Sequence, residues 1–283
     1  MNVAAIVLIA CSALAYAAGL VMYLVGQAEA LHRRSVGLVA AGLGLHTASI
    51  AAFWIAFRLP PWATACGVLA LWSWMAVVVL MVLAMRRGMQ VLGAFVVPAV
   101  LMMFAAAFAV PKRPFALPSG TPPLMALHIP LVFLAYTAFL YAAVSAALYV
   151  VQERRIKRKG PGAFYERIPP LEWLDRFTAG SLNAGFVVLT IGLALGVAWL
   201  ATSEVEGGFR DPKIGAVAVV WLLYGLVVAA RFFGWVRGRR AAAMAVACFV
   251  LVLASFVFVR HGIPSELGSA RAARAEGGAD EAP

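Results

Sequence analysis

The fold is decided by apolar runs such as Leu124–Val151, LMALHIPLVFLAYTAFLYAAVSAALYVV, which contains no charged residue. A helix of about 20 residues spans a bilayer core, and this run exceeds that length. Seven other runs also reach it: Val3–Val25, Ser35–Phe57, Ala63–Met85, Val91–Val110, Ala179–Leu200, Ile214–Phe233 and Ala241–Val259. The sequence therefore predicts an all-α polytopic membrane protein, with eight transmembrane helices bundled in a single domain over residues 1–263.

The composition of the whole chain excludes several other classes of protein. Of 283 residues, 64% are hydrophobic and 12% are charged, whereas soluble domains carry about 25% charged residues. A soluble globular enzyme, a disordered chain and a disulfide scaffold are therefore excluded. The three cysteines stand singly in apolar runs, without a CxxC or CxxCH motif. We therefore expect no thiol redox chemistry, and the chain is not itself a c-type cytochrome.

Positive charge predicts the orientation in the membrane. The net charge is +11, and 15 of the 23 Lys and Arg residues fall in the loops on one side. This distribution is a topology signal and not a nucleic-acid footprint. It places both termini outside. We expect this multi-pass protein to lie in the bacterial cytoplasmic (inner) membrane. The first run continues past Ala15–Ala17, which resembles a cleavage site, and no Lys or Arg precedes it. We expect this run to be a retained helix.

Three segments are expected to lie outside the membrane. The outer loop 111–123 contains five prolines and should be stiff. The cytoplasmic segment 152–178 is strongly basic, and its stretch Pro169–Phe177 predicts a short interfacial helix. Residues 264–283 are rich in Ala, Gly and charge and predict a disordered tail.

No carboxylate lies inside the predicted spans. If Cys and Tyr are set aside, His46 is the one ionisable side chain near the midplane of these spans. An ionisable residue at this depth is a functional candidate by default. The alternative is a neutral imidazole that bonds to a carbonyl of a neighbouring helix. Trp72 and Trp74 lie too deep for the aromatic belt and either line a flat ligand or pack between helices.

Two further histidines lie at the outer boundary, His128 at the start of the fifth span and His261 at the end of the eighth. Neutral imidazole suits iron, zinc and copper, and two imidazoles at one depth could hold a haem iron from both faces. Nearby cations could pair with the haem propionates; they are Arg260, Lys213, Arg210, Lys112 and Arg113. The alternative is a pair of ordinary interfacial histidines, and His32, beside Arg33 and Arg34, is read as a solvated loop residue.

Several motifs resemble the integral-membrane cytochrome c assembly family, which includes CcsA-, ResC- and CcmC-type haem-handling proteins and HemX-like proteins. The resemblance is strongest over Leu124–Arg231. It is carried by Pro169–Phe177, Gly185-Phe186, Leu189–Leu193, Gly196, Trp199, Leu127–Pro130, Asp211–Lys213, Trp221–Tyr224, Arg231, His261-Gly262 and Leu43–Thr47.

The resemblance implies an outer haem b held by His128 and His261 over a platform with Trp199 and Asp211, flanked by Lys213 and Arg260. It also implies a role for His46 in an inner haem site, and Trp72 is a further candidate wall for haem. The chain departs from the family pattern in two places. Where the family has platform tryptophans, this chain has Glu204, Gly208 and Arg210, and where the family has a second membrane histidine, it has Ala229. These departures favour a HemX-like, non-catalytic protein over a complete synthase.

Three functions remain open at this point. The leading interpretation is a membrane protein that binds and translocates or presents haem for cytochrome c assembly, with an assembly subunit as partner. The second is a HemX-like regulator of tetrapyrrole biosynthesis that docks a soluble enzyme through residues 152–178. The third is a transporter of another small molecule, which lacks support because no inverted repeat is evident. Haem and the lipid bilayer are the expected partners, and nucleic acid is not.

Overall fold

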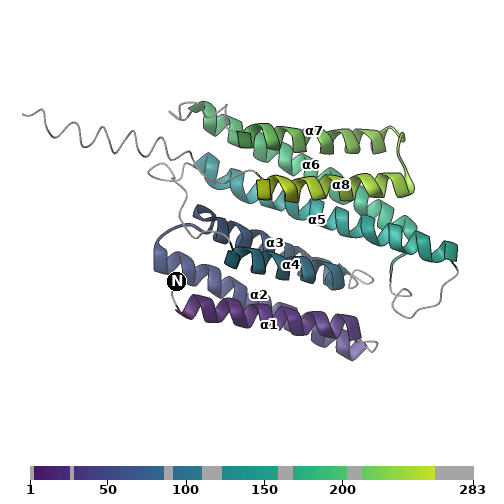
Figure 1. The fold of residues 1–283 in the computed structure, drawn as a ribbon. Helices are drawn as coiled ribbons and strands as arrows, with labels where there is room; N and C mark the ends of the chain where they lie inside the picture. The colour runs from purple at the N-terminus through teal and green to yellow at the C-terminus, as the bar shows by residue number, and fades with distance from the viewer. Residues whose placement is uncertain are drawn as a thin grey trace, which may run out of the picture.

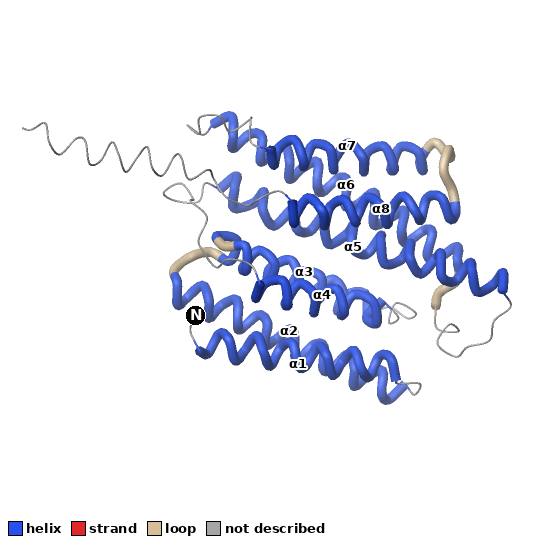
Figure 2. The backbone as a smooth tube through the Cα atoms, viewed as in Figure 1, coloured by secondary structure: helices blue, strands red, loops and turns tan. Residues whose placement is uncertain are grey.

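The computed structural model describes residues 3–25, 29–85, 92–109, 123–158, 168–202 and 212–258. The regular elements in these ranges are all helical, which confirms the predicted class (Figures 1 and 2). In chain order they are α1 (Val3–Val25), α2 (Glu29–Phe57), the short 3-10 helix η1 (Pro61–Ala63), α3 (Ala65–Ala84), α4 (Gly93–Ala109), α5 (Pro123–Arg158), α6 (Leu171–Thr202), α7 (Pro212–Phe232) and α8 (Gly238–Phe258).

Six stretches of helix in the described part of the chain are long and apolar enough to cross a membrane: Ile6–Val25, Arg33–Phe57, Ala65–Ala84, Pro123–Lys157, Leu171–Thr202 and Ile214–Phe232. They make the chain a multi-pass membrane protein. Helix α4 is apolar but shorter. The count of eight spanning helices and the outward placement of both termini therefore stay predictions.

Helix α6 differs from the sequence expectation at its start. The predicted short helix at 169–177 is not separate, because α6 runs without a break from Leu171 to Thr202. Its first backbone bond joins Leu174 N–H to Pro170 O at 3.1 Å, and the helix contains no proline that would interrupt it. Within 152–178, residues up to Arg158 continue α5. The predicted outer loop up to residue 122 and the predicted tail 264–283 lie outside the described residues.

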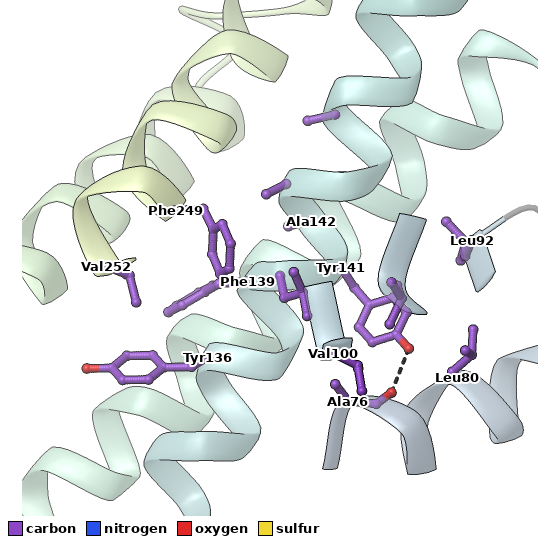
Figure 3. Close-up of a cluster of buried hydrophobic side chains, with 14 of the residues drawn as sticks. Ala76, Leu80, Leu92, Val100, Tyr136, Phe139, Tyr141, Ala142, Phe249 and Val252 are labelled. Atoms are coloured by element: carbon purple, nitrogen blue, oxygen red, sulfur yellow. Dashed lines mark hydrogen bonds between the residues drawn. The ribbon is translucent and has the colours of Figure 1, made fainter. Parts of the chain in front are cut away.

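The α-helices of the described residues form two groups, α1–α4 and α5–α8, which lie side by side in Figure 1. Helix α5 joins the two groups by packing on α3 and α4 as well as on α6 and α8. The hydroxyl of Tyr141 on α5 donates to the Ala76 carbonyl of α3 at 2.8 Å (Figure 3). On the other side of α5, Phe139 stacks on Tyr224 of α7 with ring centroids 3.6 Å apart.

Helices α5 and α6 approach closely because glycines of α6 lie at their contact. A Cβ added at Gly185 would lie 2.5 Å from Cε1 of Phe139, and one at Gly192 would lie 3.2 Å from Cγ2 of Val132. Small residues allow membrane helices to pack backbone to backbone. The same face of α6 continues to Gly196, which meets His128.

A partly buried ion pair ties α6 to α7 at the end of the bundle where α7 ends. Nη2 of Arg231 donates to Oδ1 of Asp175 at 2.9 Å and to its backbone carbonyl at 3.2 Å. The Arg231 side chain is only 11% exposed, and its Nε and Nη1 have no hydrogen-bond partner. Asp175 therefore balances a guanidinium that is largely shielded from water.

We expect Asp175→Ala to lower the free energy of unfolding by about 1–3 kcal/mol, because it leaves the buried Arg231 charge without its carboxylate. The matched control is Glu172→Ala, which breaks the exposed pair with Arg176 on the same helix, both side chains being 76% exposed. That control should cost less than about 1 kcal/mol. Thermal unfolding in detergent measures both, and equal shifts would contradict a special role for the Arg231 pair.

Candidate functional site

His128 lies in the second turn of α5 and faces α6. Its Nδ1 is 2.7 Å from the backbone carbonyl oxygen of Gly192. The ring rests against Gly196, where an added Cβ would lie 2.7 Å from both Cε1 and Nδ1. The imidazole is thus held against α6 at two positions one turn apart, the carbonyl of Gly192 and the backbone at Gly196.

This contact decides which ring nitrogen carries the proton. A carbonyl oxygen only accepts hydrogen bonds, so Nδ1 of His128 must be the donor. In the neutral ring, the lone pair then lies on Nε2. Metal-binding histidines characteristically donate their second nitrogen to a carbonyl or carboxylate in this way, which fixes both tautomer and orientation.

The end of α8 comes to the same end of the bundle as the start of α5 (Figure 1). The two helices pack against each other, and the described part of α8 ends at Phe258, three residues before His261. Trp199 lies half-buried near the end of α6, at the same end of the bundle. His261, Arg260 and Asp211 lie outside the described residues, as does the side chain of Lys213.

His46 occupies a different place, within the α1–α4 group. It is fully buried, and its Nδ1 lies 3.3 Å from the hydroxyl of Tyr16 on α1. The ring of Phe104 on α4 covers it with centroids 4.8 Å apart. Its Nε2 is buried without a hydrogen bond of normal geometry. Ala229, where the resemblance would place a second membrane histidine, lies on α7 in the other group.

The two deep tryptophans both make contacts between helices. Trp72 is 1% exposed and lies against Phe133 and Tyr136 of α5, with ring centroids 6.3 and 5.9 Å away. Trp74 donates from Nε1 to Oγ1 of Thr47 on α2 at 2.8 Å. These contacts support the packing interpretation of the two residues. The cysteines are free, and only Cys248 among them is buried.

Sequence reasoning missed the roles of Gly192 and Gly196. Both match motifs of the family in sequence, and the motifs alone do not show what the two glycines contact. Their signal lies in the spacing of Gly185, Gly192 and Gly196, which are seven and four residues apart. Such spacings put residues on one face of a helix, and a row of small residues in a membrane helix indicates close contact with a neighbour.

The described residues around His128 fit a haem iron better than those around His46. His128 is only partly buried, and its oriented Nε2 matches what an axial ligand requires. His46 is enclosed by Tyr16 and Phe104 and presents no open face to a flat macrocycle. Helices α2 and α5 also belong to different groups, so the two histidines do not form one site.

Comparison with known proteins gives the family of the chain. Residues 62–263 match the model of a family described as Cytochrome C assembly protein. The chain is 33% identical to Protein HemX of Bacillus subtilis over 134 residues, which is 47% of this chain and 48% of HemX. It is 25% identical to Cytochrome c biogenesis protein CcsA of Prochlorococcus marinus over 161 residues, which is 48% of this chain and 51% of that protein.

A longer match is to a protein of Azospirillum brasilense described as an uncharacterized 28.8 kDa protein in a nifR3-like 5' region. It is 29% identical over 197 residues, covering 68% of this chain and 72% of that protein. The matched regions span about half the length of HemX and CcsA. The family match, in contrast, covers α3 through α8.

Proposed function

Because this chain belongs to the cytochrome c assembly protein family and is HemX-like, we propose that it binds haem b at the predicted outer face of the membrane. The observation that carries the proposal is the hydrogen bond from Nδ1 of His128 to the Gly192 carbonyl, at 2.7 Å. This bond gives Nε2 the lone pair that an axial ligand needs. The bound haem would then be translocated or presented for cytochrome c assembly.

His128 and His261 would hold the haem iron. Their support is that α5 begins and α8 ends at one end of the bundle (Figure 1). Haem brings its own iron and redox chemistry, and the protein contributes ligation, orientation and charge. Arg260 and Lys213 would pair with the propionates, while Trp199 and Asp211 border the ring. No nucleophile or general base is needed for holding haem, so we propose no catalytic residue.

His46 has no part in this outer site. Its burial between Tyr16 and Phe104 supports a packing role within the α1–α4 group. Trp72, which lies against Phe133 and Tyr136, is likewise proposed to hold the two helix groups together. Substitution of either residue should affect stability rather than the spectrum of bound haem.

Titration of the purified full-length protein with ferric haem tests the proposal. Two imidazole ligands should give a six-coordinate, low-spin absorption spectrum. His261→Ala should keep binding through His128 but produce a five-coordinate, high-spin spectrum, while His46→Ala should leave the spectrum unchanged. A low-spin spectrum that persists in His261→Ala would contradict the axial pair, and absence of any Soret shift in the wild type would contradict haem binding.

A second candidate function is regulation of tetrapyrrole synthesis through a docked soluble enzyme. One observation favours it: α5 continues as a helix to Arg158, beyond its apolar part, and exposes Arg154 and Lys157. A cationic helix end could bind an acidic protein surface. Reversing these two charges should then abolish co-purification of the enzyme and leave the haem spectrum intact. Unchanged co-purification would reject this role.

A further inference from the structure

The turn of α6 from Gly192 to Gly196 touches His128 twice. The Gly192 carbonyl accepts from Nδ1 at 2.7 Å, and Gly196 lies so close to the ring that an added Cβ would meet it. The two glycines are four residues apart and therefore share one face of α6. That face meets α5, because a Cβ added at either glycine would contact a residue of α5. His46 is held differently, since its Nδ1 lies 3.3 Å from the hydroxyl of Tyr16 rather than against a backbone carbonyl.

The Gly196 contact leaves no room for a side chain. An added Cβ would lie 2.7 Å from Cε1 and Nδ1 of His128 and 3.5 Å from Nε2. Carbon atoms in van der Waals contact are about 3.5–4.0 Å apart. A methyl group at this position would push the imidazole away from α6 by several tenths of an ångström or more. The Nδ1 bond to Gly192 would lengthen or break with it.

We infer that the Gly192–Gly196 turn positions His128, by selecting the tautomer with hydrogen on Nδ1 and by directing Nε2 away from the Gly192 carbonyl. Gly196 is thus a positioning residue, and the Gly192 carbonyl is the acceptor that orients the ligand. The importance of this turn for haem binding rests on the proposed function. The tautomer itself is a property of the ligand-free protein and can be measured without haem.

Two measurements on the full-length protein test this role. The first is ¹⁵N NMR of the histidine-labelled protein without haem, with the His128 signals assigned by their loss in His128→Asn. The wild type should show hydrogen on Nδ1 alone. The second is the dissociation constant for ferric haem. Gly196→Ala should mix the two tautomers and weaken binding about tenfold, which is the usual effect of losing a partner that orients a metal ligand.

Gly180→Ala is the matched control. Gly180 lies on the same helix, and an added Cβ there meets nothing within 4 Å, so it should change neither measurement. If the wild-type His128 carries hydrogen on Nε2, the inference is wrong whether or not Gly196→Ala folds. It is also wrong if Gly196→Ala keeps both the tautomer and the affinity. Haem binding that is unchanged in His128→Ala would instead reject the proposed function and leave the tautomer result standing.

Discussion

Replacing His128 with alanine is expected to weaken ferric haem binding on the order of a hundredfold or more. The estimate follows because loss of a partner that only orients a ligand already costs about 10–100-fold. His128→Ala removes the ligand itself, together with its bond to the Gly192 carbonyl. A spectrophotometric titration in nanodiscs measures the dissociation constant.

His46→Ala is the control for this loss of affinity. His46 is fully buried in the other group of helices, so its removal should lower thermal stability. The dissociation constant for haem should change by no more than about twofold, whereas loss of a partner that orients a metal ligand costs about 10–100-fold. If His46→Ala abolishes binding while His128→Ala does not, the haem site lies in the α1–α4 group and the proposed outer site is wrong.

Gly185→Leu is expected to have the largest effect on stability, with a loss of about 3 kcal/mol or more. An added Cβ would already lie 2.5 Å from Cε1 of Phe139 and 3.2 Å from the Ala135 carbonyl. Phe139 cannot move aside, because it is fully buried and stacked on Tyr224 at 3.6 Å. The helices α5 and α6 must therefore separate, which disturbs the most extensive contact between helices in the described part of the chain.

Thermal unfolding followed by tryptophan fluorescence measures this effect. At about 2–4 °C per kcal/mol for a chain of this size, the midpoint should fall by roughly 6–12 °C. Gly180→Leu is the matched control, since its site is open, and it should shift the midpoint by less than about 2 °C. Equal shifts in the two variants would show that α5 and α6 are not packed as described.

The helices themselves could be predicted from the sequence because their cause is local. The run Val3–Val25 is apolar along its whole length, and α1 has the same bounds. At Pro169–Phe177 the charged and aromatic residues predicted a separate helix, but α6 continues through them. Charge marks the edge of an apolar run, whereas a helix ends only where backbone bonding is broken.

The candidate site could be predicted only in part. An isolated histidine at the start of a span was enough to single out His128. Its partner could not be predicted, because the Gly192 carbonyl is 64 residues away in the chain and its approach depends on the register between α5 and α6. The enclosure of His46 likewise depends on how α1 and α4 pack around α2.

The most direct test of His128 as a haem ligand is rescue by free imidazole. His128→Gly leaves a gap the size of the missing ring beside Gly192 and Gly196. Ferric haem added to this variant should bind weakly and high-spin, and millimolar imidazole should restore the wild-type low-spin spectrum. Imidazole should have no comparable effect on His46→Gly. A His128→Gly protein that binds haem with the wild-type spectrum before imidazole is added would contradict ligation by His128.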